Sequence, residues 1–213
     1  GGLIMVHSDD IGLVMPPKIA PIHVIIIPIF NNDEEKNAVL EKAKEIKNNL
    51  EKALNIRVKI DIRDDQRPGE KYYYWEKRGM PIRIEIGPRD LKSESVVTVR
   101  RDTAVKESVS FDTLSKKIQS LLSDIQSNLY NRALKFRDEK IIEVSNWDDF
   151  VKQIENGNFV LAYWDGEKST EAEIKEKTKA TIRCIPFSEK ESKGKCILSG
   201  KASKQRVIFA RSY

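Results

Sequence analysis

The 213-residue sequence predicts an α/β fold, in which helices pack on a mixed sheet, followed by a smaller α+β domain. Two observations support this prediction. Between residues 21 and 63 the hydrophobic pattern changes from strand to helix to strand, which is typical of two parallel strands joined by a crossover helix. From residue 141 a second series of helices and strands begins, after a long helical segment. We expect the boundary between the domains near residue 138.

The first 17 residues, GGLIMVHSDDIGLVMPP, are predicted to form two short strands with a turn between them. Two short strands cannot bury an apolar face by themselves. The sequence begins without a Met, and it lacks the positive region and cleavage site of a signal peptide. We therefore expect the chain to start inside a longer protein and this segment to complete a sheet that belongs to upstream sequence.

Three segments form the strand–helix–strand unit. PIHVIIIPI, residues 21–29, is a continuous β-branched run, as in a strand covered on both faces. Residues 32–54 place apolar side chains at helical spacing, with Asp33 expected as the N-cap. NIRVKIDIR, residues 55–63, alternates Ile and Val with charged side chains. Such a strand is half-buried, so we expect Ile62 to be inside and Asp61 to be exposed.

The remaining elements follow from the same patterns. Strands are predicted where β-branched residues gather or alternate with polar ones, and helices where apolar residues recur three and four apart. In the first domain these are a helix over 71–78, strands at PIRIEIG, SVVTVRRD and KESVSF, and a long helix over 113–140. In the second they are helices in SNWDDFVKQIENGN and EAEIKEKTKA and strands in FVLAYW, TIRCIPF and VIFARSY.

Composition limits the classes of protein to which the chain can belong. Charged residues make up 33% and apolar ones 39%, with a net charge of +5, which suits a soluble domain and is compatible with an anionic polymer as partner. No apolar run approaches the roughly 18 to 20 residues that cross a bilayer. Two cysteines, Cys184 and Cys196, argue against a disulfide framework and fit a reducing compartment. We therefore expect a cytoplasmic protein without a membrane segment.

No set of catalytic residues stands out. The two histidines, His7 and His23, lie far in sequence from both cysteines, and no glycine-rich phosphate loop is present. A structural zinc site needs four Cys or His ligands in closely spaced pairs, which the chain lacks. The acidic pair at 9–10 could bind a metal, but a turn between strands is the commoner explanation. The pair at 64–65 follows a strand end and could serve as a site or as a helix-capping loop. We predict no catalytic residues, no metal ligands and a binding function.

The stretch QRPGEKYYYWEKRGMPIRIEIGPRD, residues 66–90, places three tyrosines and a tryptophan in a row among basic side chains. On a helix, Tyr72 and Trp75 share one face with Glu76, so at most two rings can point into the core. One interpretation is that Tyr72 and Trp75 pack the helix on the sheet, which composition alone slightly favours. The other is a nucleic-acid surface, where rings stack on bases, cations contact phosphates or guanines, and carboxylates accept from exocyclic amines.

Four segments together resemble the C-terminal half of prolyl-tRNA synthetases of the archaeal/eukaryotic type: the first 29 residues, RPGEKYYYWEKRGMPIRIEIGPRD, RCIPF and the terminal FARSY. The likeness covers essentially the whole chain. It implies an ATP-dependent class II ligase that joins proline to its tRNA, usually as a homodimer. The catalytic domain, with its ATP and magnesium, would lie upstream. The chain alone is therefore expected to need no cofactor, to bind the anticodon stem-loop of proline tRNA, and to be inactive.

The resemblance also divides the chain. Residues 1–19 would end the class II catalytic domain, residues 20–138 would form a mixed-sheet class II anticodon-binding domain with a long linking helix, and residues 139–213 would form the C-terminal domain. In the family, the loop, helix and strand that match residues 66–90 face the anticodon, where cations would read two guanines. The nucleic-acid-binding residues that this implies are Arg67, Lys71, Trp75, Glu76, Arg83, Glu85, Arg89 and Arg100.

Many members of the family hold zinc between four cysteines in the C-terminal domain. At the matching positions this chain has Asp165 and Thr170 instead of the first pair, and only Cys196 of the second. The resemblance therefore implies the fold without the metal. A rival interpretation of the whole chain is a protein interaction or assembly module without base reading, which requires Tyr73 and Trp75 both to be buried.

Overall fold

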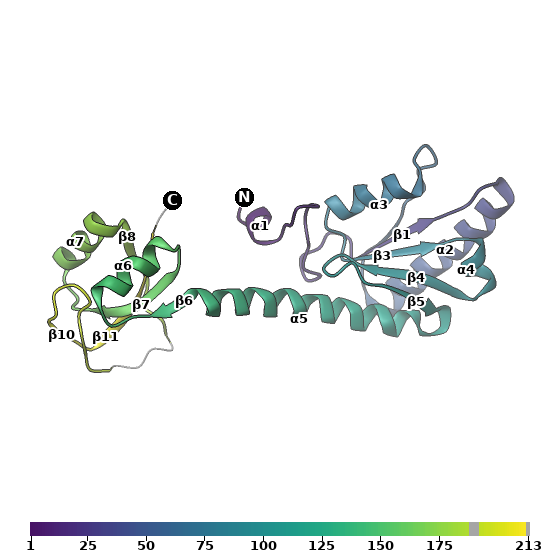
Figure 1. Cartoon of the computed structure of the whole chain (residues 1–213). Coiled ribbons are helices and arrows are strands. Elements are labelled where there is room, and N and C mark those ends of the chain that lie inside the picture. The colour runs from purple at the N-terminus through teal and green to yellow at the C-terminus, as the bar shows by residue number, and fades with distance from the viewer. Residues whose placement is uncertain (188–191, 212–213) are drawn as a thin grey trace. The chain divides into compact units, whose positions relative to one another are not determined.

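The computed structural model describes residues 1–187 and 192–211. The chain divides into two compact units, Gly1–Asn131 and Arg132–Tyr213 (Figure 1). The division falls inside the long helix α5 (Leu114–Lys140), which confirms the predicted long helix and places the division before residue 138. None of the helices in the described ranges is long and apolar enough to span a membrane.

The first unit is built on a five-stranded mixed sheet with the order β2-β1-β3-β4-β5. Three strands are parallel, since β1 (Val24–Pro28) pairs with β2 (Val58–Ile60) on one side and with β3 (Ile82–Ile86) on the other. The antiparallel strands β4 (Ser95–Arg100) and β5 (Lys106–Ser110) complete the sheet. The predicted parallel pair and mixed sheet are confirmed.

Helices cover both faces of this sheet, because successive side chains of a strand point to opposite sides. One set of side chains lies in the main core with α2 (Asp33–Leu54) and α5. The other set, which includes Ile25 and Ile27 of β1, packs against Trp75 of α3 (Pro68–Lys77). Figure 1 shows α3 on one side of the sheet and α5 on the other.

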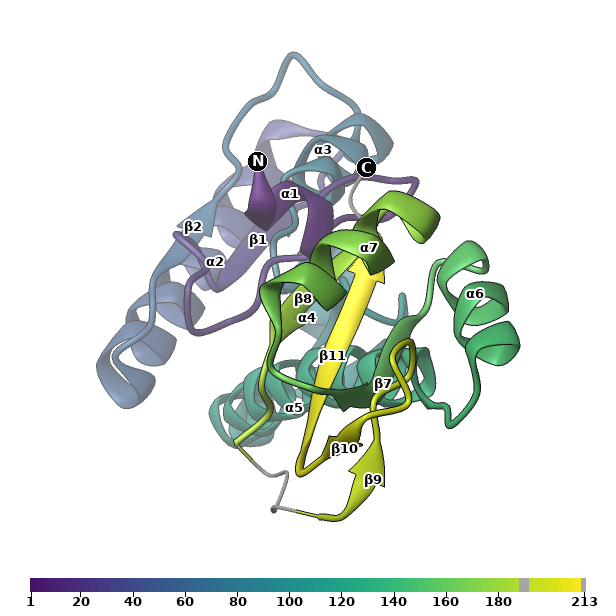
Figure 2. The ribbon, with the colours of Figure 1, turned by 90° about the vertical axis from the view of Figure 1, so that its left-hand side faces the viewer.

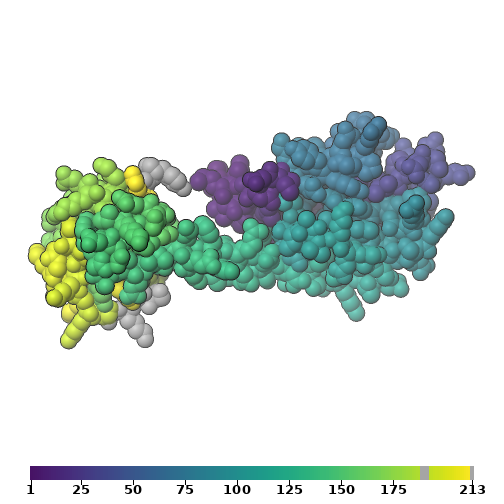
Figure 3. All heavy atoms as spheres, in the orientation of Figure 1, coloured from purple at the N-terminus to yellow at the C-terminus, as the bar shows by residue number. Residues whose placement is uncertain are grey.

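The N-terminus forms a short helix, α1 (Gly2–Val6), and not the predicted first strand. No strand lies beside it in the described part of the chain, so its backbone groups bond within the segment, as from the N–H of Met5 to the carbonyl of Gly1. The predicted strand pairing is reduced to one isolated bridge between Ser8 and Leu13. The side chains of α1 are exposed and stand at the surface in Figure 3.

The chain beyond this bridge is attached to the C-terminal end of α3. The N–H of Leu13 donates to the carbonyl of Lys77 at 3.0 Å, and that of Met15 to the carbonyl of Gly79 at 3.2 Å. A Cβ on Gly79 would lie only 2.7 Å from the backbone of Leu13. Gly79 also has a φ of +72°, in the left-handed region that favours glycine. The close approach of the two backbones therefore requires a glycine here.

The strand β2 is shorter than the predicted strand 55–63, and this changes which side chains are buried. It ends at Ile60, where the chain leaves the sheet. Asp61 is then buried and Ile62 is 69% exposed, the reverse of the prediction. Two short elements of this unit were not predicted, α4 (Pro88–Lys92) after β3 and the 3-10 helix η1 (Phe111–Thr113) before α5.

The second unit contains a four-stranded sheet with the order β6-β7-β11-β8. At its centre β7 (Phe159–Trp164) and β11 (Gln205–Arg211) form an antiparallel pair, and β8 (Ala180–Cys184) lies beside β11 (Figure 2). The edge strand β6 (Ile141–Glu143) pairs with β7 in parallel. The last two residues of the predicted strand 207–213 lie outside the described ranges.

Two helices and a small hairpin complete the second unit. The helices are α6 (Trp147–Glu155) and α7 (Lys168–Thr178), both of which were predicted, and they share an apolar core with the sheet. The hairpin consists of β9 (Gly194–Lys195) and β10 (Ala202–Ser203), which were not predicted because two-residue strands have no periodicity to detect. The α/β class of the chain is confirmed.

Replacing Gly79 by Ala is expected to destabilise the first unit by about 2 kcal/mol or more, because left-handed strain adds to overlap with the backbone of Leu13. The matched control is Gly157→Ala, since Gly157 has a φ of +74° but nothing within 4 Å of an added Cβ. That variant should cost its own unit only about 1 kcal/mol. Urea unfolding with each unit followed separately by NMR measures both. Equal losses would contradict the close contact.

Candidate nucleic-acid interface

The aromatic and basic stretch folds into α3, whose ends are set by local chemistry. Pro68 stands in the first turn, where its missing N–H has no helical partner to lose. The Glu70 carboxylate accepts the N–H of Arg67 at 2.8 Å and closes this end of the helix. The helix ends at Lys77 with Arg78 as its C-cap, and the chain turns into β3, which carries Arg83 and Glu85 of the predicted site.

The four rings of α3 have different surroundings. Trp75 is buried, and its Nε1–H donates to Oδ2 of Asp61 at 2.7 Å. Tyr72 and Tyr74 are half-buried against the same small core, whereas Tyr73 is 59% exposed. The rival interpretation as an interaction module required Tyr73 and Trp75 both to be buried, and Tyr73 does not meet that condition.

The Arg83 cluster, which we define as Tyr72, Glu76, Arg83 and Glu85, joins α3 to β3. The Arg83 guanidinium lies 2.5 Å from Glu76, 2.9 Å from Glu85, and 4.1 Å from the centre of the Tyr72 ring. Arg83 is buried, while both carboxylates are partly exposed. Burial, and then the charge of Glu85, raise the pKa of Tyr72 to about 12, so its hydroxyl stays protonated at neutral pH.

This cluster is suited to hydrogen bonding with base edges. A guanidinium has five N–H groups in a planar fork that matches O6 and N7 of guanine, and carboxylates accept from amino groups. Two carboxylates face the one guanidinium of Arg83, which leaves one excess negative charge, and Lys106 offsets it from 3.8 Å away from Glu85. A set without excess positive charge gives little attraction for phosphate, so the cluster favours base reading over backbone binding.

Two other predicted residues, Lys71 and Trp75, point inward. Lys71 is 4% exposed, and its Nζ lies 3.5 Å from the backbone oxygen of Asp61. Burial lowers the pKa of this lysine. Both side chains hold α3 on the sheet in this conformation, so neither presents itself to a base.

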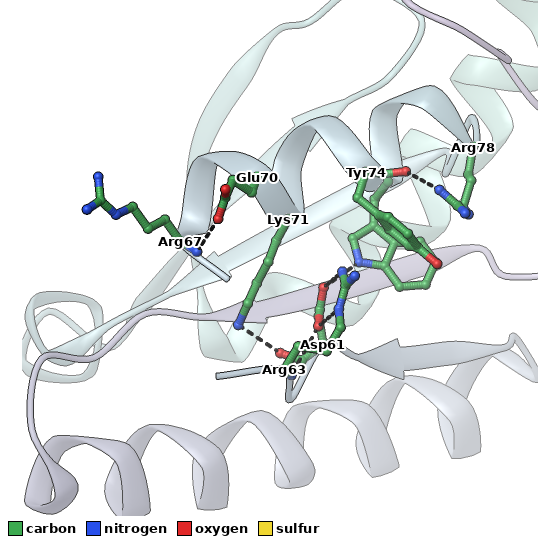
Figure 4. Close-up of polar contacts among 8 residues, drawn as sticks. Asp61, Arg63, Arg67, Glu70, Lys71, Tyr74 and Arg78 are labelled. Carbon is green, nitrogen blue, oxygen red and sulfur yellow. Dashed lines mark hydrogen bonds and ion pairs between the residues drawn. The ribbon is translucent and has the colours of Figure 1, made fainter. Parts of the chain in front are cut away.

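Three predicted arginines lie outside the Arg83 cluster. Arg67 is exposed and points away from the other labelled residues in Figure 4. Arg89 is exposed and lines a hollow of about 480 Å³ at the carboxyl ends of β1 and β3. Arg100 is held by Asp102 through hydrogen bonds of 3.0 and 2.7 Å. The predicted residues that the structure brings together are Glu76, Arg83 and Glu85.

Asp61 is an organising residue that the sequence did not indicate. Its carboxylate is 2% exposed and accepts from the Trp75 indole and from Nε and Nη2 of Arg63, at 2.8 and 2.5 Å (Figure 4). Burial raises the pKa of Asp61, but the hydrogen bonds from Arg63 and Trp75 outweigh it and lower the pKa to about 2. The ionised carboxylate thus ties α3 to the end of β2.

Arg101 is a second residue that no sequence signal identified. Its guanidinium donates to the backbone carbonyl of Glu76 at 2.9 Å and to both carboxylate oxygens of Asp9 at 2.6 and 2.8 Å. The hydrogen bond from Arg101 is the main cause that lowers the pKa of Asp9 to about 2. Arg101 therefore links the N-terminal segment to the end of α3 that carries Glu76.

We define the Asp165 cluster of the second unit as Asp165, Thr170, Cys196 and Ser199. It contains the positions 165, 170 and 196, where the resemblance implies zinc ligands. Oδ2 of Asp165 accepts from the hydroxyls of Thr170 at 3.0 Å and Ser199 at 2.6 Å. Burial acts to raise the pKa of Asp165, but these hydrogen bonds and one from the buried Cys196 lower it.

These residues do not fit a zinc ion. Structural zinc takes thiolates and imidazoles, whereas the Asp165 cluster offers two hydroxyls, a carboxylate and one thiol. Across residues 1–187 and 192–211, no three His, Cys, Asp or Glu side chains gather as a metal site would require. The Asp165 carboxylate lies at the centre of the cluster and accepts the hydrogen bonds of the two hydroxyls.

Comparisons with known proteins agree with this geometry. Residues 23–121 match the family described as "Anticodon binding domain", so the first unit contains an anticodon-binding domain. Residues 147–213 match the family described as "Prolyl-tRNA synthetase, C-terminal". The chain therefore carries the anticodon-binding and C-terminal domains of a prolyl-tRNA synthetase.

Curated relatives match over the whole chain. It is 50% identical to the Proline--tRNA ligase of Phocaeicola vulgatus, 47% to that of Porphyromonas gingivalis and 49% to that of Bacteroides fragilis. The chain spans only 43 to 44% of the length of these relatives. All three are bacterial, so the expected archaeal/eukaryotic type is not borne out.

Replacing Asp61 by Asn should destabilise the first unit by about 2 kcal/mol at neutral pH, since the lowered pKa corresponds to roughly that stabilisation. The folded pKa lies below the unfolded value of 3.8, so the stabilisation is present above 3.8 and is lost as the pH falls towards about 2. The free energies of unfolding of the wild-type chain and of Asp61→Asn, measured in urea at several pH values, should converge in acid. A difference that stays constant with pH would contradict this role, and exposed Asp65→Asn is the control.

Proposed function

We propose that this chain is the anticodon-reading part of a proline–tRNA ligase, an ATP-dependent class II aminoacyl-tRNA synthetase. The observation that carries the proposal is the Arg83 cluster, a buried guanidinium held between two partly exposed carboxylates of an anticodon-binding domain. Relatives 47 to 50% identical to the chain and named Proline--tRNA ligase support it. The partner would be proline tRNA, bound through its anticodon stem-loop.

The whole enzyme would be a cytoplasmic homodimer that joins proline to this tRNA. Its ATP and magnesium would be held by an upstream class II catalytic domain, because the relatives are much longer than this chain, which covers 43% of the first of them. The chain alone would supply tRNA selection and no aminoacylation.

Base reading would use the planar fork of Arg83 on O6 and N7 of one guanine, with Glu76 or Glu85 accepting from an amino group. Arg89 is the candidate for the second guanine, because it lines a hollow at the carboxyl ends of parallel strands, where open α/β sheets bind ligands. Each bidentate pair would contribute about 1–3 kcal/mol of discrimination.

Replacing Arg83 by Lys keeps the charge and removes the fork. We expect the preference for a proline anticodon stem-loop, over one with both guanines replaced, to fall about ten-fold or more. Fluorescence anisotropy with both labelled stem-loops measures this ratio. Because Arg83 is buried, Glu85→Gln is a second variant that removes one acceptor charge with little change in shape.

Lys44→Gln is the control, since Lys44 is an exposed residue of α2, on the opposite face of the sheet. It should leave the ratio unchanged. A wild-type chain that binds both stem-loops equally would overturn the proposed function.

We also propose that the second unit folds without a metal ion. The Asp165 cluster supports this, because hydrogen bonds to one carboxylate connect the segment before α7 with the hairpin of β9 and β10. The chain would then need no cofactor of its own.

Removing Asp165 should destabilise the second unit, and removing metals should not. Asp165→Asn is expected to cost about 1 kcal/mol, because a charged acceptor of hydroxyl hydrogen bonds is lost. The lowered pKa of Asp165 means that the stabilisation is present above 3.8 and is lost as the pH falls through the folded value. Thermal unfolding with and without EDTA, with Glu176→Gln as an exposed control, measures these effects. Unfolding by EDTA would contradict the proposal.

A further inference from the structure

The two sides of α3 carry different charge. On the side of β3, Arg83 is matched by Glu76 and Glu85. On the side of β2 the cations outnumber the carboxylates that reach them. We define the Tyr74 cluster as the residues that meet there, Lys59, Arg63, Tyr74 and Arg78.

Two guanidinium groups share the ring of Tyr74. The central carbon of Arg78 lies 3.5 Å from the ring centre, and that of Arg63 lies 4.1 Å from it. Lys59 of β2 adds a third cation, with its Nζ 5.3 Å from the centre of the Trp75 ring. Figure 4 shows Arg63, Tyr74 and Arg78 gathered at the C-terminal half of α3. Aromatic faces thus hold three cations in one small area.

The carboxylates near these cations leave a positive excess. Asp61 pairs with Arg63, but its side chain is buried beneath the cluster, and Asp65 acts on Arg63 only through its charge. The guanidinium of Arg78 bonds only to the backbone carbonyl of Tyr74, and no carboxylate in the described part of the chain forms an ion pair with it. Arg78 and Lys59 are both exposed. Like charges held together repel each other, so an anion bound here would relieve that repulsion.

We propose that the Tyr74 cluster binds a phosphate of the RNA backbone, beside the bases read by the Arg83 cluster. This inference rests on the proposed function and adds a second contact to it. The four residues of the cluster present N–H donors, and the Tyr74 hydroxyl is the one side-chain acceptor among them, which is the composition of a backbone site. Its guanidinium groups are already ordered by Tyr74 and Asp61, so little side-chain freedom is lost on binding.

The test is the salt dependence of anticodon stem-loop binding by Arg78→Gln. A phosphate contact carries no sequence information, so the variant should bind the proline stem-loop and the guanine-substituted one more weakly by the same factor, about three- to ten-fold at low salt. The slope of log affinity against log salt should fall by about 0.7. Lys59→Gln should act in the same direction and serves as a second variant if Arg78→Gln unfolds. Lys44→Gln on α2 is the control and should change neither quantity.

Three results separate this inference from the proposed function. Unchanged affinity and slope in both variants, while Arg83→Lys alters the preference between stem-loops, would overturn the phosphate site and leave the proposed function standing. A loss confined to the proline stem-loop would also overturn it, because it would make Arg78 a base reader. Equal weakening of both stem-loops with a smaller slope would support the phosphate site even if the wild-type chain showed no anticodon preference.

Discussion

The position of α3 depends on the carboxylate of Asp61. This buried group accepts the indole N–H of Trp75 from the helix and the guanidinium of Arg63 from the chain after β2. A buried carboxylate must be paired and hydrogen-bonded. Arg63 supplies the ion pair from the same segment, so moving the helix away from the strand end would break the indole hydrogen bond to this charged acceptor. With Trp75 fixed inward, the neighbouring positions of the helix must project to its two sides.

The two sides of α3 have different chemistry because they face different strands of the sheet. The side next to β3 meets Arg83 and Glu85, and becomes a cluster without excess positive charge that is suited to base edges. The side next to β2 meets Arg63 and Lys59, and becomes a basic cluster suited to phosphate. One short helix thus lies between the cluster proposed to contact bases and the cluster proposed to contact the phosphate backbone. Arg101 fixes the far end of this helix to the N-terminal segment.

Hydrophobic periodicity predicted the parts of the fold that depend on it, such as α2, α5 and the strands β1 and β3. It failed where tertiary contacts determine the burial or the pairing of a side chain. Asp61 occupies an exposed phase of an alternating pattern, yet it is buried because β2 stops one residue earlier. Arg100 is captured by Asp102, and no sequence pattern encodes that pairing. The family resemblance located the stretch 66–90, but only the geometry shows that Glu76, Arg83 and Glu85 form one cluster while Lys71 and Trp75 hold α3 on the sheet.

The most direct test of the central claim is a crystal structure of this chain with the anticodon stem-loop of proline tRNA. The account predicts a guanine edge within hydrogen-bonding distance of Arg83, with Glu76 or Glu85 beside it, and a backbone phosphate against Arg78. A complex in which the anticodon bases bind elsewhere, and the Arg83 cluster keeps its internal ion pairs untouched, would contradict it.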